Sequence, residues 1–199
     1  MRLPSAAHIS QPWRIHDIAS DFRLEDVWAL PARGAREDFP QLVEWFTRAS
    51  ERENPSFLTR TLFAIRWMLG ELMGWDDAES GVGSRVRALR ERLPADLREG
   101  PRGPDFAALP FRSLYMLENE FAAETANSTM HGLLHLGWVP EGSGGYRGQM
   151  AVLVKPNGAF GNAYMTAIRP FRHLIVYPAL MRQIEHAWRK RAAATAASR

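Results

Sequence analysis

Residues 120–140 (EFAAETANSTMHGLLHLGWVP) and 149–158 (QMAVLVKPNG) decide the fold, together with a helical pattern at 169–190 (RPFRHLIVYPALMRQIEHAWRK). The first two stretches hold apolar runs bounded by turn residues, which is typical of antiparallel strands. In the third, apolar residues recur at intervals of three and four, which predicts one long C-terminal helix. We therefore expect an α+β fold, in which a curved antiparallel sheet wraps around the C-terminal helix.

The chain has 199 residues and no cysteine. This length suits one domain, which we place at residues 13–191, with a flexible lead-in at 1–12 and a disordered tail at 192–199. Without cysteine the chain can form no disulfide and has no thiolate nucleophile. The N-terminus lacks the apolar segment of a signal peptide, and no apolar run approaches ~20 residues. We therefore expect a cytoplasmic protein with no membrane span.

The net charge of +3 comes from the end of the chain. Residues 1–161 hold 18 Lys and Arg against 21 Asp and Glu, whereas residues 162–199 hold 7 against 1. Cations near the end of a helix interact favourably with its last carbonyl groups. Aromatic and basic residues do not alternate along any expected strand, as they do in single-strand binders. We therefore predict no nucleic-acid partner.

The remaining elements follow from local patterns. We expect a first strand at Trp13–Ile18, two helices at 39–49 and 58–73, and a short basic helix after Ser84. Four prolines and two glycines predict a long loop at 94–110. Further strands are expected at 111–117, 121–126, 130–139 and 149–155. Because EFAAETA also contains good helix formers, a short helix at 120–130 is the alternative to a strand there.

The C-terminal helix carries two prolines and a fully apolar segment. Pro170 and Pro178 each remove one helix hydrogen bond, so we expect kinks or a break. From Leu174 to Met181 no residue is charged. A helix that is apolar on all sides is covered on more than one side. The sheet with a lid could cover it, and so could a second copy of the chain.

Glu124, His131 and His135 are the candidate catalytic residues. The two histidines are four residues apart, so they share one face of either a strand or a helix. Glu124 joins them if the two expected strands pair. Glycine follows His131, where a zinc-protease helix has its glutamate, and we predict no metal site. The alternative is a pair of histidines in the core or on the sheet surface, satisfied by hydrogen bonds.

Four motifs carry a resemblance to a known family: N-S-T-M-H-G (127–132), L-G-W-V-P (136–140), G-G-Y-R-G-Q-M-A-V-L-V-K-P-N-G (144–158) and P-F-R-H-L-I-V-Y-P-A-L (170–180). The chain resembles a bacterial domain-of-unknown-function family whose members also occur fused behind atypical short-chain dehydrogenases. The match covers about Trp13 to Trp188. That family is similar to the helix-grip (SRPBCC) superfamily of START lipid-transfer domains, plant pathogenesis-related proteins and aromatic polyketide cyclases.

The resemblance implies a strand, two helices, a run of antiparallel strands and a long helix. It also implies a pocket between sheet and helix for an apolar, aromatic or polyketide-like small molecule. We expect these side chains to bind it: Tyr115, Trp138, Met150, Tyr164, Ile168, Phe171, His173 and Tyr177.

A cyclase-type reaction would be a cofactor-independent cyclisation, dehydration or isomerisation. It needs a base near neutral pKa and a donor facing the enolate oxygen. His131, His135 or His173 is the expected base, and a pocket tyrosine or Arg112 the donor. The alternatives are a non-catalytic carrier or sensor, and a homodimeric interaction module. The residues leave open whether the protein is an enzyme.

Overall fold

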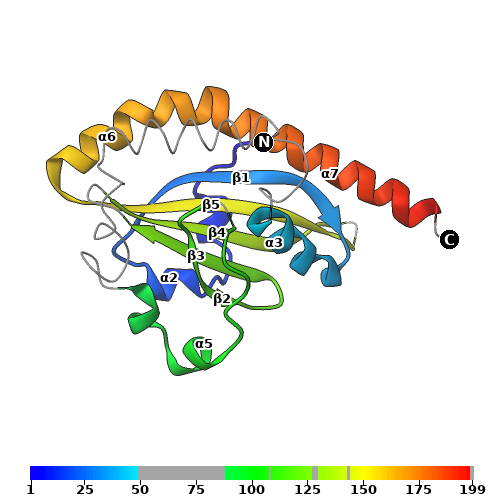
Figure 1. Cartoon of the computed structure of the whole chain (residues 1–199), viewed down its shortest axis with the longest axis horizontal. Helices are drawn as coiled ribbons and strands as arrows, with labels where there is room; N and C mark the ends of the chain where they lie inside the picture. Colours follow the sequence, from blue (N-terminus) through cyan, green and yellow to red (C-terminus); the bar gives the residue numbers. More distant parts are fainter. Residues whose placement is uncertain (49–87, 108, 127–129, 143, 198–199) are drawn as a thin grey trace.

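The computed structural model describes residues 1–48, 88–107, 109–126, 130–142 and 144–197. Within these ranges, five strands form one antiparallel sheet in the order β1-β5-β4-β3-β2 (Figure 1). The strands are β1 (Arg23–Gly34), β2 (Arg112–Met116), β3 (Glu120–Ala126), β4 (Met130–Pro140) and β5 (Tyr146–Pro156). Together with the long C-terminal helix, this sheet confirms the expected α+β class.

Short helices precede and interrupt the strands. The chain begins with α1 (Ala6–Ile9) and α2 (Ile15–Ile18), and η1 (Arg36–Asp38) and α3 (Phe39–Thr47) follow β1. A second helical group, η2 (Leu89–Arg92) and α5 (Ala95–Glu99), comes before β2. The C-terminal helix consists of α6 (Gly158–Phe171), η3 (Arg172–Val176) and α7 (Tyr177–Ala197). None of the helices in the described ranges has the length and hydrophobicity that crossing a bilayer requires.

The strand predicted at Trp13–Ile18 is wrong. Ile15 and Ile18 are both buried, and their spacing of three fits one turn of α2, whereas side chains three apart on a strand point to opposite faces. The first strand is β1, and Leu3 extends the sheet beyond it by donating its N–H to the Val27 carbonyl at 2.8 Å. Residues 1–12, expected as a loose lead-in, carry α1 and bury His8.

The other predicted elements agree better with the structure. The helix predicted from Phe39 is α3, with Pro40 in its first turn as expected. Residues 120–126 form β3, so the helix considered for that segment is wrong. The loop predicted at 94–110 contains the helical turn α5. The helix predicted at 58–73 and the start of the basic helix lie outside the described residues.

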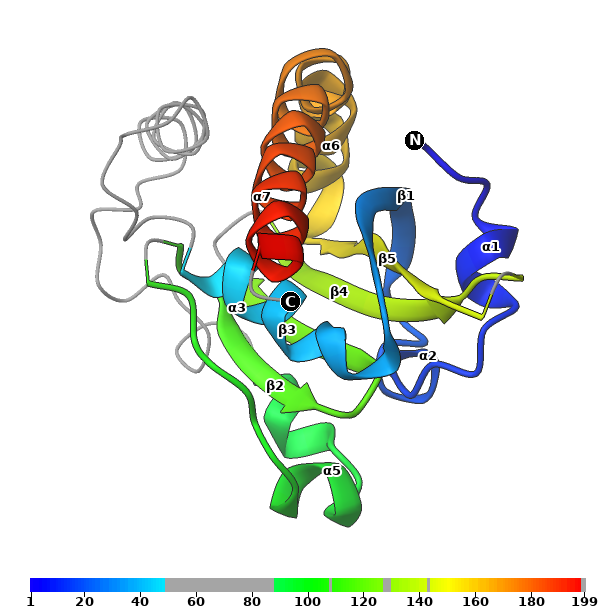
Figure 2. The same cartoon turned by 90° about the vertical axis from the view of Figure 1, so that its right-hand side faces the viewer.

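The sheet is buried on both faces. Side chains alternate between the faces of a strand. On one face, called here the helix face, Leu136 and Trp138 of β4 belong to the same cluster as Phe39 of α3 and Tyr177 of α7. On the other face, called the back face, Leu133 lies in a cluster with α2, η2 and α5. Figure 2 shows α6 and α7 above the sheet, with α2 and α5 below it.

The C-terminal helix changes geometry at η3, which is a π-helical turn. Pro170 and Pro178 flank this turn, so the predicted break takes the form of a local widening and not of a separation into two helices. Two apolar side chains near this turn face solvent, with exposed fractions of 76% for Leu174 and 42% for Ile175. The apolar segment of the helix is therefore only partly covered within one chain.

Candidate functional site

The expected catalytic residues all lie on the back face. Glu124 and His131 form one pair, and His135 pairs instead with Glu120, four residues earlier on β3. All four side chains are buried. The predicted pairing of the two strands is confirmed, because β3 and β4 are antiparallel neighbours. The predicted trio is nevertheless divided into two carboxylate–histidine pairs, and both face away from the C-terminal helix.

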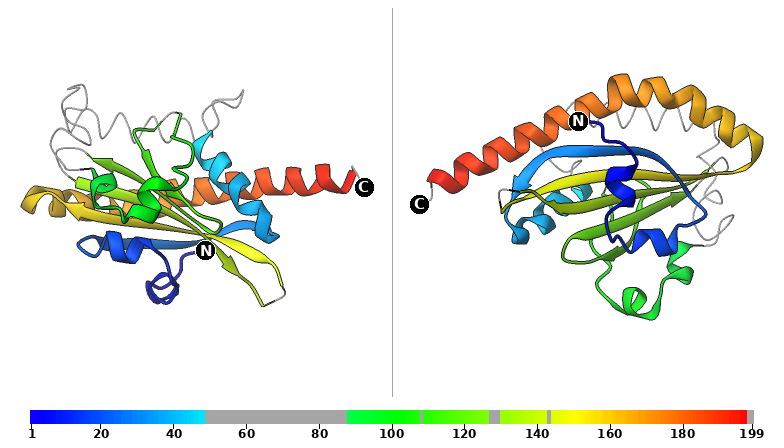
Figure 3. Two further views of the ribbon diagram at one scale, coloured as in Figure 1. Left: turned by 90° about the horizontal axis from the view of Figure 1, so that it is seen from below. Right: turned by 180° about the vertical axis from the view of Figure 1, so that it is seen from behind.

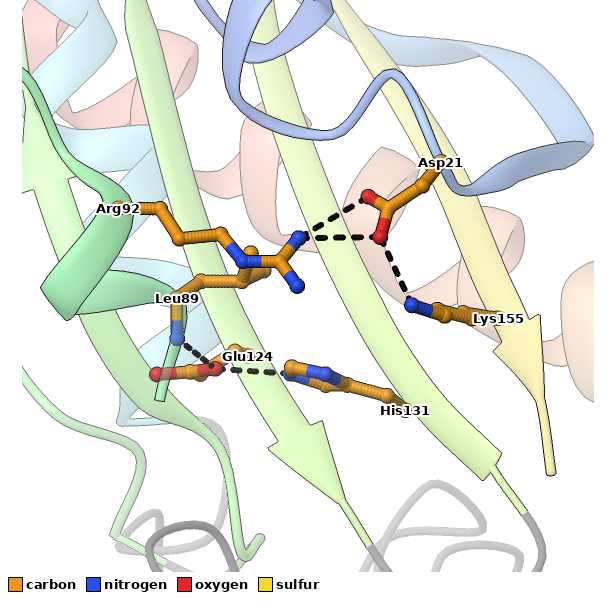
Figure 4. Close-up of polar contacts among 6 residues, drawn as sticks. All are labelled: Asp21, Leu89, Arg92, Glu124, His131 and Lys155. Atoms are coloured by element: carbon orange, nitrogen blue, oxygen red, sulfur yellow. Dashed lines mark hydrogen bonds and ion pairs between the residues drawn. The ribbon is translucent and has the colours of Figure 1, made fainter. Parts of the chain in front are cut away.

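The Glu124–His131 pair holds η2 against the sheet (Figure 4). One carboxylate oxygen, Oε2, lies 2.8 Å from Nε2 of His131 and accepts the N–H of Leu89 at 3.0 Å. Arg92 of η2 also pairs with Asp21, which in turn lies 2.8 Å from the Lys155 ammonium group. These contacts give Glu124 and His131 a structural role: they fix a helical turn on the back face.

The side chains predicted to bind a ligand are spread over the molecule. Tyr115 lies on the back face, and its hydroxyl donates to Glu120 at 2.6 Å. Trp138 and Met150 are core residues of the helix face. Ile168 packs near Val154 in a small separate cluster. Phe171 is half-buried, and Tyr164 belongs to α6, with its side chain outside the described part. The remaining two residues, His173 and Tyr177, meet at Asp26.

Asp26 is a carboxylate buried beneath the π turn. It belongs to β1, and its side chain has no exposed surface. Tyr177 donates its hydroxyl proton to Oδ2 at 2.8 Å, and Arg172 Nη2 lies 3.4 Å from the same oxygen. His173 Nε2 lies 2.7 Å from Oδ1, but without hydrogen-bond alignment, so this contact is an ion pair when the imidazole is protonated. Together with Trp28, whose ring lies 4.8 Å from that of Tyr177, these residues form what we call the Asp26 cluster.

Several polar atoms of the Asp26 cluster are buried without hydrogen bonds. They are three donors, Trp28 Nε1, Arg172 Nε and Arg172 Nη2, and the two atoms of the Asp26–His173 contact. Of the donors, Arg172 Nη2 lies within ion-pair distance of two carboxylates, Asp26 at 3.4 Å and Glu25 at 3.6 Å. A buried donor without an acceptor costs about 1–3 kcal/mol. Native proteins hold few such groups, and those that exist mark strain, bound water or a ligand site. Trp28 Nε1 and Arg172 Nε therefore have no acceptor among the described residues, and a bound oxygen acceptor would satisfy them.

The cluster keeps Tyr177 protonated. Burial and the adjacent Asp26 carboxylate raise the pKa of the Tyr177 phenol above its usual value. The phenol is therefore a hydrogen-bond donor throughout the neutral range. Access from solvent remains, since the side chains of Arg172 and His173 keep exposed fractions of 14% and 18%.

A groove of about 590 Å³ lies elsewhere, between the end of β1 and the second half of α7. Its lining includes Leu30, Arg147 and Trp188 but no member of the Asp26 cluster. It is open to solvent, and one of its lining atoms, Arg147 Nε, is also buried without a hydrogen bond, 3.6 Å from Glu141. Because several such atoms gather around one buried carboxylate in the Asp26 cluster, we place the site there and not at this groove. Among the described residues, no group of three His, Asp or Glu could hold a metal ion.

Asp26 and Arg172 were not among the residues predicted for the site. Asp26 has a weak signal, because it stands directly before the apolar residues 27–30 of β1 but follows another acidic residue, Glu25. The sequence gives less indication of Arg172, because an arginine that is one of several on a helix is expected to be exposed to solvent. Only the packing of η3 against β1 brings the two together.

A family model described as "Protein of unknown function (DUF2867)" matches residues 18–179. This range covers most of the chain, including the whole sheet and the Asp26 cluster. The chain therefore belongs to the DUF2867 family. None of the curated proteins and none of the solved structures matches it.

Proposed function

We propose that this DUF2867 member is a helix-grip protein that binds an apolar small molecule, aromatic or polyketide-like, between its sheet and its C-terminal helix. The observation that carries the proposal is the Asp26 cluster, a buried carboxylate beneath a π turn with unpaired donors around it. Such turns are frequent at functional sites. The order of strand, helix, antiparallel strands and long helix agrees with the helix-grip resemblance, which is an analogy at the level of the fold.

The donors of the cluster define the ligand's polar group. Trp28 Nε1 and Arg172 Nε donate and have no acceptor, so the ligand presents an oxygen that accepts, as a ketone, a phenolate or a carboxylate does. The aromatic rings of Trp28 and Tyr177 offer apolar surface beside these donors. The proposed ligand is thus apolar with one acceptor oxygen.

A pair of fluorescent probes tests this site. 1-Anilinonaphthalene-8-sulfonate carries an anionic acceptor, and N-phenyl-1-naphthylamine has the same aromatic skeleton without it. We expect both to bind, and Arg172→Gln to weaken the sulfonate about tenfold, roughly 1.4 kcal/mol, while the neutral probe stays within about twofold. Arg182→Gln, which removes an exposed arginine of α7, is the matched control. Absence of binding by either probe, or equal effects of both substitutions, would contradict the proposal.

The same residues can remove a proton beside a ketone. His173 would take the proton from the α carbon, and the electron pair of the broken C–H bond would move onto the carbonyl oxygen. Asp26 balances the charge of the resulting imidazolium, and Arg172 faces the enolate oxygen. The protein is then a cofactor-independent isomerase or cyclase. Without this step it is a carrier or sensor of the same ligand.

Deuterium exchange separates the enzyme from the carrier. We expect the wild type to accelerate incorporation of solvent deuterium at the α carbon of 2-tetralone, a small aromatic ketone. His173→Gln should abolish the acceleration and leave probe affinity within about tenfold. If His173→Gln reduces the exchange rate and the probe affinity by the same factor, His173 has a binding role. If the wild type does not accelerate exchange, the protein is a carrier or sensor.

A second candidate function is an interaction module that pairs two copies of the chain. The observation in its favour is the exposure of Leu174 and Ile175 at the π turn. Burying these side chains against a second copy would remove apolar surface from water. Light scattering after size exclusion tests it: a dimer that Leu174→Asp converts to a monomer would support this candidate.

A further inference from the structure

Three imidazoles form a chain from near the surface into the back face. His16 Nε2 lies 3.2 Å from His8 Nδ1, and His8 Nε2 lies 3.1 Å from His135 Nδ1. His135 Nε2 then reaches Glu120 Oε1 at 3.1 Å. His8 and His135 are almost completely buried, whereas His16 is partly exposed. The proposed function uses none of these residues.

The carboxylate fixes the direction of every hydrogen bond in this chain. Glu120 also accepts from the Tyr115 hydroxyl and from the backbone N–H groups of Arg14 and Ile15. Although burial acts to raise the pKa of Glu120, the hydrogen bonds from His135 and Tyr115 hold it below its usual value. An ionised carboxylate only accepts, so His135 must donate to it through Nε2.

The remaining tautomers follow in turn. A neutral His135 that donates through Nε2 accepts at Nδ1, so His8 must donate through Nε2. His8 then accepts at Nδ1, and His16 must donate to it through Nε2. Each contact holds one proton, and the outer nitrogen of His16 is the one vacant position. The intact chain can therefore take up one extra proton, whereas a second would place two donors face to face.

Separated from one another, the three imidazoles could take up three protons. When the three histidines are packed together, they therefore bind at least two protons fewer than they would bind after release. Burial and the neighbouring imidazoles of His135 and His16 lower the pKa of His8 to about 3. Burial, followed by His135, also lowers the pKa of His16. Because the folded pKa values lie below ~6.5, the stability of this arrangement is present above that pH and is lost as the pH falls through it.

The three-histidine chain is one of several contacts that hold the N-terminal segment, residues 1–18, on the sheet. Trp13 sits on Gly137 so closely that a Cβ there would lie 2.6 Å from its ring. Gln149 donates to the Ala7 carbonyl at 3.2 Å. At the sheet edge, Met1 and Ala29 exchange backbone hydrogen bonds of 2.9 and 2.8 Å. Figure 3 shows this segment, in dark blue, crossing the strands when the molecule is seen from behind.

We propose that residues 1–18 are an acid-releasable cover of the back face and of the edge of β1, with the three-histidine chain as the proton-sensitive contact. The charged groups that face the chain are Glu120, Asp17 and Arg14. Glu120 neutralises a first proton, and Arg14 is already paired with Asp96 at 2.7 Å. No second carboxylate is hydrogen-bonded to His8 or His135 among the described residues, so a second proton is not neutralised.

Release frees the edge of β1 at Val27–Ala29, which contains Trp28 and adjoins Asp26, two members of the Asp26 cluster. Arg2, which lies 3.9 Å from Asp26, would leave with the segment. This consequence for the site rests on the proposed function. Release itself does not, and it is measured separately.

Native-state hydrogen exchange, followed by mass spectrometry and corrected for intrinsic rates, measures release. Between about pH 7 and pH 5, we expect the opening constant of residues 1–18 to rise, with a slope that approaches about 100-fold per pH unit or more, which corresponds to at least two protons. The amides of β4 and β5 should keep their protection over this range. An unchanged opening constant, or equal loss of protection by β4, would overturn the proposal.

Two substitutions make the test specific. His16→Gln leaves two imidazoles, so the pH dependence of the opening constant should fall to about tenfold per pH unit. His8→Gln removes the central imidazole and separates the other two, so the pH dependence should fall well below that of the wild type, with a remainder from the burial of His16. Since His16 is partly exposed, His16→Gln serves where His8→Gln fails to fold. An undiminished dependence in His16→Gln would refute the proton count.

Discussion

Glu120→Gln is expected to lower the free energy of unfolding by about 3 kcal/mol or more. The carboxylate accepts from His135, Tyr115, Arg14 and Ile15 within a buried site. A glutamine amide has one acceptor oxygen, and its NH₂ group would face donors. Each buried donor left without an acceptor costs about 1–3 kcal/mol. Urea unfolding near pH 7.5 measures the change.

Glu118→Gln is the matched control for this substitution. Glu118 lies two residues earlier, pairs with Arg36, and has a side chain that is 75% exposed. Exposed ion pairs contribute about 0–1 kcal/mol, so the control should change stability little. If the two substitutions have the same effect, Glu120 does not anchor the N-terminal segment.

Trp138→Ala is expected to cost about 3–5 kcal/mol, in the range of large-to-small substitutions in a core. The Trp138 side chain is fully buried, stacks parallel to the Tyr146 ring, and donates its Nε1 proton to the Ala35 carbonyl at 2.9 Å. Removing it leaves a cavity and an unpaired carbonyl. Thermal and urea unfolding should agree on the size of the loss.

Trp188→Ala provides the comparison. Trp188 is only partly buried and lines the open groove, although it also donates to a carbonyl, that of Arg33 at 2.8 Å. A loss of about 1–2 kcal/mol is expected there. A small effect of Trp138→Ala, combined with loss of probe binding, would return Trp138 to the role of a ligand-binding residue.

Strand periodicity and turn residues were enough to predict most of the sheet. β3, β4 and β5 carry apolar runs bounded by glycine, proline or polar turns, and the C-terminal helix has a long apolar stripe. The prediction of an N-terminal strand failed because WRIHDI fits both the helix and the strand period. The helix there is held by Glu120, more than a hundred residues away. Local pattern contains no information about such a contact.

The prediction of the site was limited because the sequence does not show which face of the sheet packs against the helix. The sequence placed Glu124, His131 and His135 on one face correctly, but a β-strand pattern does not say which face of a sheet meets the helix. Here both faces are buried, so apolar residues occur at odd and even positions of β4 alike. The Asp26 cluster depends on packing between β1 and η3, which are far apart in the chain.

Native mass spectrometry of the protein purified from its own host tests the central claim most directly. We expect the wild type and Arg182→Gln to carry a small-molecule adduct that is lost on denaturation. Arg172→Gln, which removes two donors of the Asp26 cluster that make no hydrogen bond, should lose most of it. A clean dimer mass for the wild type, with no adduct, would contradict the ligand-binding account and favour the interaction module.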